Sequence, residues 1–202
     1  KVYVLFMTVG TTQDFSSKNK STQDQRMREI KWVAKFLRFD GYRIAFPGNT
    51  YHLRLDTIAQ KDLIHEIERG KKISLEALNP SIVITSSAHD YNQDHRAAYH
   101  ATIAATRPAS PNVKSFQKII LTFDHPTDTW TVGDALPLKT MYVELTDLDF
   151  QAKIKALKLY RSQLKHPGNP ISLRSAKNLA LLNGAQSGST YAEAFSIKRL
   201  VT

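Results

Sequence analysis

Residues 86–96 form the part of the sequence best suited to chemistry, because they are almost all polar or titratable. They include His89, His95 and a carboxylate, Asp94, directly beside the second histidine. In a chain without cysteine, a hydrolytic zinc site needs about three His, Asp or Glu ligands and an open position for water. The pattern therefore predicts His95 as a metal ligand and Asp94 as a carboxylate that orients a histidine. A solvated polar loop that caps a helix is the alternative interpretation.

The neighbouring segments place this polar run at the end of a strand. Residues 82–85 are predicted to form a buried strand, and residues 95–106 a helix that Pro108 terminates. In α/β proteins, ligands bind beyond the carboxyl ends of the strands. The polar run thus lies where such a fold places a binding or catalytic site.

The rest of the chain continues this alternation. Strands are predicted at residues 2–7, 42–46, 118–123, 141–145 and 194–201, and helices at residues 27–39, 61–78, 147–164 and 173–182. Such an order predicts an α/β three-layer sandwich with a mostly parallel sheet. The continuous apolar run at residues 2–7 is typical of a central strand buried on both faces. We therefore expect residues 1–202 to form a single domain whose first strand and helix lie upstream of this sequence.

The amino-acid composition limits the kinds of partner that we expect this protein to bind. The 28 basic and 18 acidic side chains give a net charge of +10, which predicts attraction to anions. The basic residues are scattered and lack interleaved aromatic residues, so nucleic acid is not an expected partner. No apolar run is long enough to span a membrane and no leader segment is recognisable, which predicts a soluble, cytoplasmic protein. The absence of cysteine fits a reducing compartment.

Several motifs together resemble those of the PIG-L/LmbE-like de-N-acetylase family. The strand at residues 80–85 followed by Asp94-His95-Arg96-Ala97 is similar to the family's second motif. Arg26 with Glu29 resembles its Arg-x-x-Glu element. Near the C-terminus, Gly184, Gly188 and residues 191–195 (Tyr-Ala-Glu-Ala-Phe) resemble its closing element. The resemblance covers nearly the whole chain in register.

This resemblance implies a Rossmann-like, LmbE-like fold and a zinc-dependent hydrolase. The expected reaction removes acetyl from an N-acetylglucosamine-type sugar or a related amide, and phosphate or lipid on that sugar is left open, as is a homo-oligomer. The resemblance implies one Zn²⁺ with His95 as a ligand, Asp94 beside it, and Asn92 as a hydrogen-bond donor to the reacting carbonyl. Contacts with the substrate are expected from His89, Arg96, Tyr191 and Glu193.

The sequence also departs from the family pattern. The His-Pro-Asp-Asp motif that gives the family its other two ligands and its general base is absent from these residues. Asn92-Gln93 replace a His-Pro pair, and Val9 stands where an Asp is usual. A non-catalytic carbohydrate- or anion-binding protein on the same fold is therefore the competing hypothesis.

A second His/Asp cluster, at residues 124–128, repeats the spacing of the absent motif. Its sequence is Asp-His-Pro-Thr-Asp, directly after the predicted strand at residues 118–123. Its place in the chain fits a later loop of the family, so we predict that it forms a wall of the site. A substitute pair of metal ligands is the alternative, which requires these side chains to converge on His95.

Overall fold

The computed structural model describes residues 1–13, 20–110, 112–123, 125–126 and 138–202. Its helices are α1 (Gln23–Phe36), α2 (Gln60–Arg69), α3 (Leu75–Leu78), α4 (Gln93–Ala105), α5 (Asp147–Leu159) and α6 (Leu173–Ser187). Short 3₁₀ turns lie at Leu55–Thr57 and Arg161–Gln163. The strands are β1 (Tyr3–Val9), β2 (Thr12–Gln13), β3 (Lys20–Ser21), β4 (Gly41–Pro47), β5 (Ile82–Thr85), β6 (Ile119–Phe123), β7 (Met141–Leu145) and β8 (Tyr191–Leu200).

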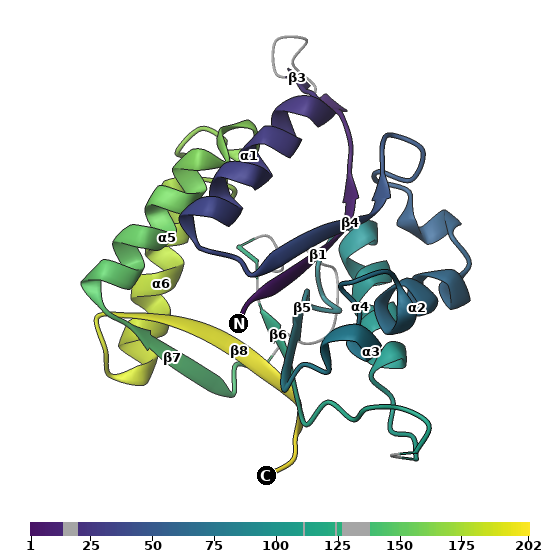
Figure 1. The fold of residues 1–202 in the computed structure, drawn as a ribbon. Coiled ribbons are helices and arrows are strands. Elements are labelled where there is room, and N and C mark those ends of the chain that lie inside the picture. The colour runs from purple at the N-terminus through teal and green to yellow at the C-terminus, as the bar shows by residue number, and fades with distance from the viewer. Residues whose placement is uncertain (14–19, 111, 124, 127–137) are drawn as a thin grey trace.

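Strands in the middle and helices on both sides make three layers. Helices α1, α5 and α6 lie on one side and α2, α3 and α4 on the other (Figure 1). β1 pairs in parallel with β4, and β5 pairs in parallel with β6, as crossover helices require. β8 pairs antiparallel with both β6 and β7. The predicted α/β three-layer class is confirmed, with parallel pairing in the N-terminal half and antiparallel pairing at the C-terminal end.

Side-chain caps fix where the helices that frame the site begin. The Thr22 hydroxyl accepts the backbone N–H of Gln25 at the start of α1, and Asn92 accepts that of Asp94 at the start of α4. The predicted helix at residues 61–78 is instead two helices, because Gly70 ends α2 and Ser74 caps α3.

A buried cluster beneath α2 and α4 packs these helices against β1, β4 and β5. Its members are Leu55, Leu63, Ile67, Leu75, Ala101 and Ala105.

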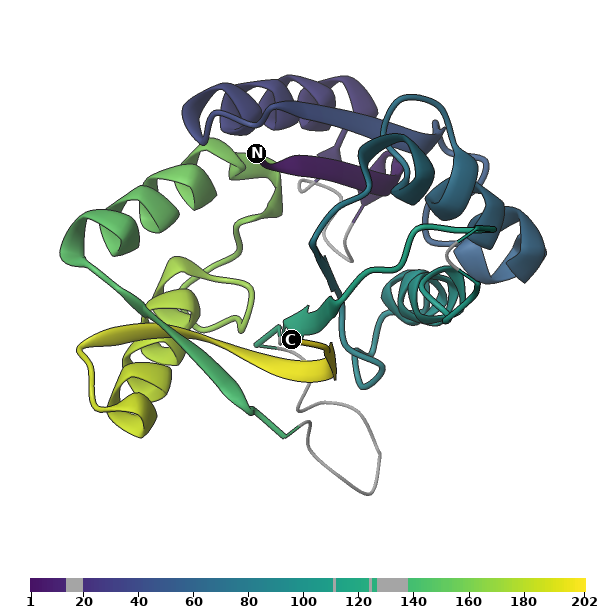
Figure 2. The ribbon, with the colours of Figure 1, turned by 60° about the horizontal axis from the view of Figure 1, so that its bottom comes forward.

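The described strands form two separate groups, β1–β4 and β5–β6–β8–β7, seen apart in Figure 2. β1 pairs with β4 only and β5 with β6 only, so each has one unpaired edge among the described residues. A pocket of about 1580 Å³ runs between these two edges. Apolar side chains remain exposed there, with Ile82 48% and Ile84 51% exposed. We call this space, bounded by β1 and β5, the interstrand slot.

Helix α6 packs closely against the strand that follows it. A Cβ on Gly184 would lie 2.4 Å from the backbone oxygen of Thr190, which cannot move without shifting β8. Gly184→Ala is therefore expected to lower the free energy of unfolding by about 1–3 kcal/mol, measured by urea denaturation. Gly168→Ala is the control, because its Cβ would meet only His166 at 3.7 Å. Equal stability of the two variants would contradict the close approach.

No helix in the part of the chain that the structure describes is long and apolar enough to cross a membrane. The cytoplasmic location and the homo-oligomer that the sequence suggested stay predictions.

Candidate active site

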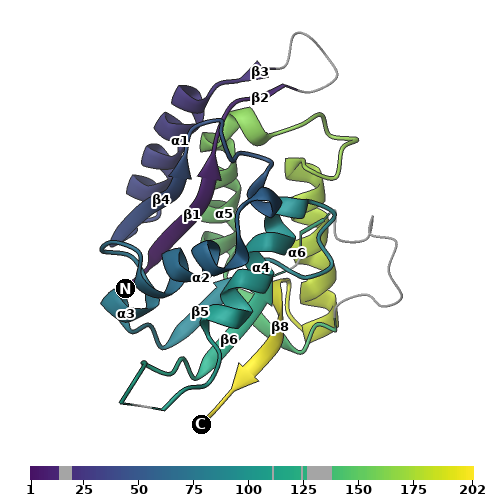
Figure 3. The same cartoon turned by 90° about the vertical axis from the view of Figure 1, so that its right-hand side faces the viewer.

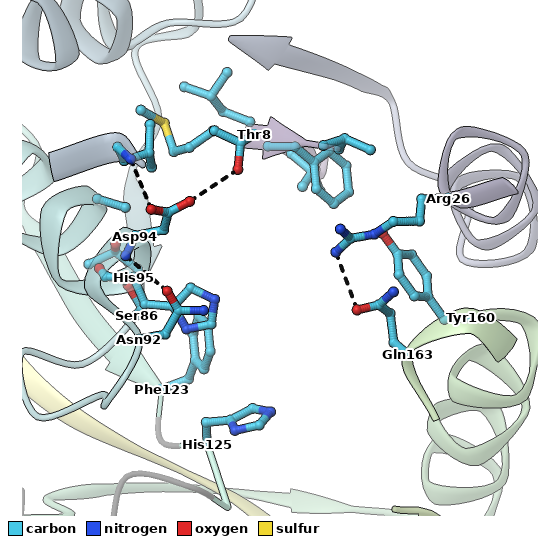
Figure 4. Close-up of a pocket in the computed structure, with 18 of the residues that line it drawn as sticks. Thr8, Arg26, Ser86, Asn92, Asp94, His95, Phe123, His125, Tyr160 and Gln163 are labelled. Atoms are coloured by element: carbon cyan, nitrogen blue, oxygen red, sulfur yellow. Dashed lines mark hydrogen bonds between the residues drawn. The ribbon is translucent and has the colours of Figure 1, made fainter. Parts of the chain in front are cut away.

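The carboxyl ends of β1 and β5 meet at one end of the interstrand slot. Thr8 near the end of β1 and Ser86 just after β5 both contact the first turn of α4, through Asp94 and His95 respectively. His95, Asn92 and His125 line the pocket on this side, with Arg26, Tyr160 and Gln163 on the facing wall (Figure 4). The run of polar residues predicted to form a site is therefore at the rim of a large pocket.

His95 is held by a buried carboxylate. Its Nδ1 lies 2.5 Å from Oδ2 of Asp90, whose side chain is 2% exposed, whereas 46% of the His95 side chain is exposed. Burial raises the pKa of Asp90, but the hydrogen bonds from His95 and the backbone N–H of Asn92 outweigh it and leave the pKa below its ordinary value. An ionised carboxylate only accepts, so Nδ1 of His95 carries the proton and Nε2 the lone pair when the ring is neutral. Such carboxylate–histidine pairs are typical of histidines that bind metal.

The loop between β5 and α4 is stiffened by its own side chains. The Asn92 Oδ1 accepts the backbone N–H of Asp94 at 2.9 Å, which leaves its NH₂ group as the part able to donate. Arg96 donates from Nη1 to the backbone oxygens of Asp90 at 2.7 Å and Tyr91 at 2.6 Å. Arg96 was predicted to contact the substrate, but its guanidinium is hydrogen-bonded to the loop that carries Asp90.

The carboxylate of Asp94 is engaged by groups outside α4. Its carboxylate accepts the backbone N–H groups of Leu53 at 2.8 Å and Leu55 at 2.9 Å, and Thr8 Oγ1 lies 3.5 Å from it. It therefore joins the first turn of α4 to the segment after β4 and to β1. The orienting carboxylate of His95 is Asp90, five residues earlier.

His125, in the second His/Asp cluster, also belongs to this pocket. It lines the pocket together with His95. Burial lowers the pKa of His125, the charge of Asp90 raises it and that of His95 lowers it. This fits the prediction that the loop forms a wall of the site. Asp124, Thr127 and Asp128 lie outside the described residues, so the alternative of a ligand pair at residues 124–128 stays a prediction.

A cluster that the sequence analysis did not assign to the site occupies the facing wall. Arg26 from α1 donates to Nε2 of His52 at 2.9 Å and to Oε1 of Gln163 at 3.2 Å. Arg26 had stood out in the sequence as part of an Arg-x-x-Glu element, but no pattern marked His52, and Gln163 was not assigned to the site. Their convergence depends on contacts between segments far apart in the chain.

The four residues predicted to bind substrate, His89, Arg96, Tyr191 and Glu193, are absent from the lining of this pocket. Tyr191 stacks on Phe150, with ring centroids 4.0 Å apart and planes 4° from parallel. Glu193 pairs with Lys153 across the β8–α5 contact. His89 lies on the loop before α4, where its backbone N–H donates to Ser87 Oγ. The structure brings Asn92, Asp94 and His95 to the pocket.

The described residues do not by themselves make a complete metal site. No group of three or more His, Asp or Glu side chains within the described ranges is arranged to hold a metal ion. A catalytic zinc takes three protein ligands. His95 with Asp90 has the donor chemistry of one such ligand, so the remaining donors would have to come from elsewhere.

Comparisons with known proteins agree with this geometry. Residues 1–106 match the family model described as PIG-L, GlcNAc-PI de-N-acetylase. No curated protein sequence matches the chain.

Solved structures show the same fold at low identity. A conserved protein from Thermus thermophilus has a TM-score of 0.65 at 18% identity, covering 100% of this chain and 95% of its own. A deacetylase from the teicoplanin biosynthesis pathway has a TM-score of 0.67 at 17% identity, covering 97% and 86%. N,N'-diacetylchitobiose deacetylase from Pyrococcus horikoshii has a TM-score of 0.65 at 19% identity, covering 98% and 73%.

Proposed function

The chain belongs to the PIG-L family, and from that premise we propose that it is a hydrolase that removes acetyl from an N-acetylglucosamine-type sugar or a related amide. The observation that carries this proposal is the His95–Asp90 pair at the carboxyl end of β5, at the rim of a pocket large enough for a sugar. The family match covers the strand, loop and helix that position this pair.

The chain's own residues have distinct tasks in this proposal. Asp90 holds the His95 ring in one orientation and one tautomer, and Arg96 holds the backbone that carries Asp90. The NH₂ group of Asn92 is suited to donate a hydrogen bond to the acetyl carbonyl oxygen as negative charge develops there. Unlike a histidine in that position, Asn92 cannot change its protonation state.

Zinc dependence is part of the proposal and needs donors beyond the described residues. We propose that a further strand of the same protein fills the interstrand slot, between the unpaired edges of β1 and β5. Such a strand would satisfy both edges, cover Ile82 and Ile84, and end beside Thr8 and Ser86, next to His95. The end of that strand is thus the place from which the missing ligands would reach His95.

A native mass spectrum, together with an assay of acetate release from N-acetylglucosamine and diacetylchitobiose, tests this proposal. A mass above the 22.8 kDa of this chain, with one bound zinc and acetate release, is expected. A protein of 22.8 kDa that binds these sugars without metal and without releasing acetate would contradict the hydrolase. That outcome would favour the competing function, a carbohydrate- or anion-binding protein, which the incomplete ligand set of the described residues supports.

A further inference from the structure

Helix α1 presents a row of positive charges to solvent. Arg28, Lys31 and Lys35 are exposed, and their spacing of three and four residues places them on one face of the helix. The buried residues Ile30 and Ala34 lie on the opposite face. The three cations are absent from the lining of the pocket, so this row belongs to the outer surface of the molecule.

Helix α5 extends this row. It packs beside α1 (Figure 1), and Nζ of Lys155 lies 5.0 Å from the centre of the Phe36 ring. Lys158, three residues after Lys155 on the same face of α5, is also exposed. The two helices are far apart in the sequence, which is why these charges look scattered there. We call the five cations of this surface the cationic face: Arg28, Lys31, Lys35, Lys155 and Lys158.

The cationic face is not neutralised by neighbouring carboxylates. None of its five side chains forms an ion pair with an Asp or Glu that the structure describes. By contrast, Lys153, half-buried on α5, pairs with Glu193. The exposed acidic residues of the two helices lie in the first turns, where they favour the helix dipoles: Asp24, Asp147 and Asp149. Beyond those turns, both helices expose positive charge alone.

Two large apolar side chains accompany the cations. Trp32 is 50% exposed beside Lys31 on α1, and Leu148 is 76% exposed at the start of α5. Tryptophan is enriched at membrane–water interfaces, because one part of its ring system is apolar and its N–H is polar. A surface for single-stranded nucleic acid stacks successive bases on several aromatic side chains, whereas Trp32 is the one exposed aromatic residue of the described helices α1 and α5. The combination favours lipid over nucleic acid.

We propose that the cationic face, together with Trp32 and Leu148, docks this protein on the surface of an anionic lipid bilayer. Negatively charged headgroups attract each Lys or Arg that comes close to them, and the two apolar side chains would enter the boundary between headgroups and acyl chains. This inference does not rest on the proposed hydrolysis, because none of these residues lines the pocket.

Sedimentation with lipid vesicles tests the docking. The protein should bind vesicles of phosphatidylcholine and phosphatidylglycerol, mixed at about 2:1, and should not bind vesicles of phosphatidylcholine alone. Raising NaCl from about 0.05 M to about 0.5 M should release it, because salt screens the attraction. Failure to bind the anionic vesicles, equal binding to both kinds, or binding that salt does not weaken would overturn the proposal.

A pair of variants with the same net charge locates the surface. Changing the four lysines of the cationic face to glutamine should lower the affinity for the anionic vesicles at least about a hundredfold. Four exposed lysines outside α1 and α5 are changed to glutamine in the control, which should lose less than about fivefold: Lys61, Lys71, Lys72 and Lys118. Glutamine is a good helix former, so both variants should fold, which circular dichroism verifies. Equal losses would overturn the cationic face as the docking surface.

The fluorescence of Trp32 reports whether this face reaches the lipid. Anionic vesicles should shift the emission to shorter wavelength, and Trp32→Phe should lose that shift. The other tryptophan of the chain, Trp130, is present in both proteins, so the difference between them belongs to Trp32. An identical shift in Trp32→Phe would overturn the proposed contact of α1 with lipid.

Two further measurements separate this inference from its alternatives. Tighter binding to a single-stranded RNA oligonucleotide than to the anionic vesicles, at equal salt, would overturn the proposal in favour of nucleic acid. The variant without the four lysines should release acetate from a soluble N-acetylated sugar as the unaltered protein does. Vesicle binding without any acetate release would support the docking surface and contradict the hydrolase, and acetate release without vesicle binding would do the opposite.

Discussion

Replacement of His95 by alanine is expected to lower kcat/KM for acetate release by at least about a thousandfold. The ring is the titratable group that the structure brings to the rim of the pocket with a buried carboxylate fixed on its Nδ1. Without it, Asp90 is left as a buried carboxylate that has lost its strongest partner. The initial rate of acetate release measures the effect, and the bound zinc in a native mass spectrum should fall with it.

Two variants sharpen this test. Asp90→Asn keeps the shape of the side chain but weakens its hydrogen bond with Nδ1 of His95. We therefore expect a loss of about 10–100-fold in metal affinity or activity. His100→Ala is the control, because His100 lies on the same helix but is exposed and contacts the Tyr99 ring. A His95→Ala protein that retains activity, or a His100→Ala protein that loses as much, would contradict the assignment of the site.

The order of strands and helices was predictable because local patterns determine it. The bounds predicted for the strand at residues 82–85 are those of β5, where four apolar or β-branched residues lie between polar segments. The helix predicted at residues 147–164 ends earlier, at Leu159, because Tyr160 caps it and the 3₁₀ turn Arg161–Gln163 follows. The short strands β2 and β3 were not predicted, since two-residue strands have no periodicity to recognise (Figure 3).

The site was predictable only where its residues are neighbours in sequence. His95 and Asn92 lie in a polar run directly after β5, and the topology places that run at the pocket. The choice between Asp90 and Asp94 was not predictable, because it depends on which way the loop folds back over the first turn of α4. Arg26 and His52 meet through α1 and the segment after β4, and no spacing in the sequence encodes that contact.

Replacement of Asp94, the residue before His95 in the sequence, should have its largest effect on the stability of the fold. The side chain is 5% exposed, and its two oxygens accept backbone N–H groups from Leu53 and Leu55. In Asp94→Ala these buried donors lose an ionised acceptor, and each such hydrogen bond contributes roughly 1.5–3 kcal/mol. We therefore expect the free energy of unfolding to fall by about 3–5 kcal/mol, measured by urea denaturation.

Comparison with Asp94→Asn distinguishes this structural role of Asp94 from a catalytic role. An asparagine keeps one of the two acceptor oxygens and places its NH₂ group at the other, so it should recover only part of the lost stability but, once folded, much of the activity. A general base or an orienting carboxylate would not tolerate that change, because an amide can neither take a proton nor stabilise a charged ring. If Asp94→Asn is as stable as the unaltered protein but inactive, then Asp94 acts in the reaction and its contacts with Leu53 and Leu55 are secondary. If both variants lose stability and Asp94→Asn retains activity, the carboxylate serves to join α4 to β1 and to the segment after β4, and so positions the turn from which His95 extends.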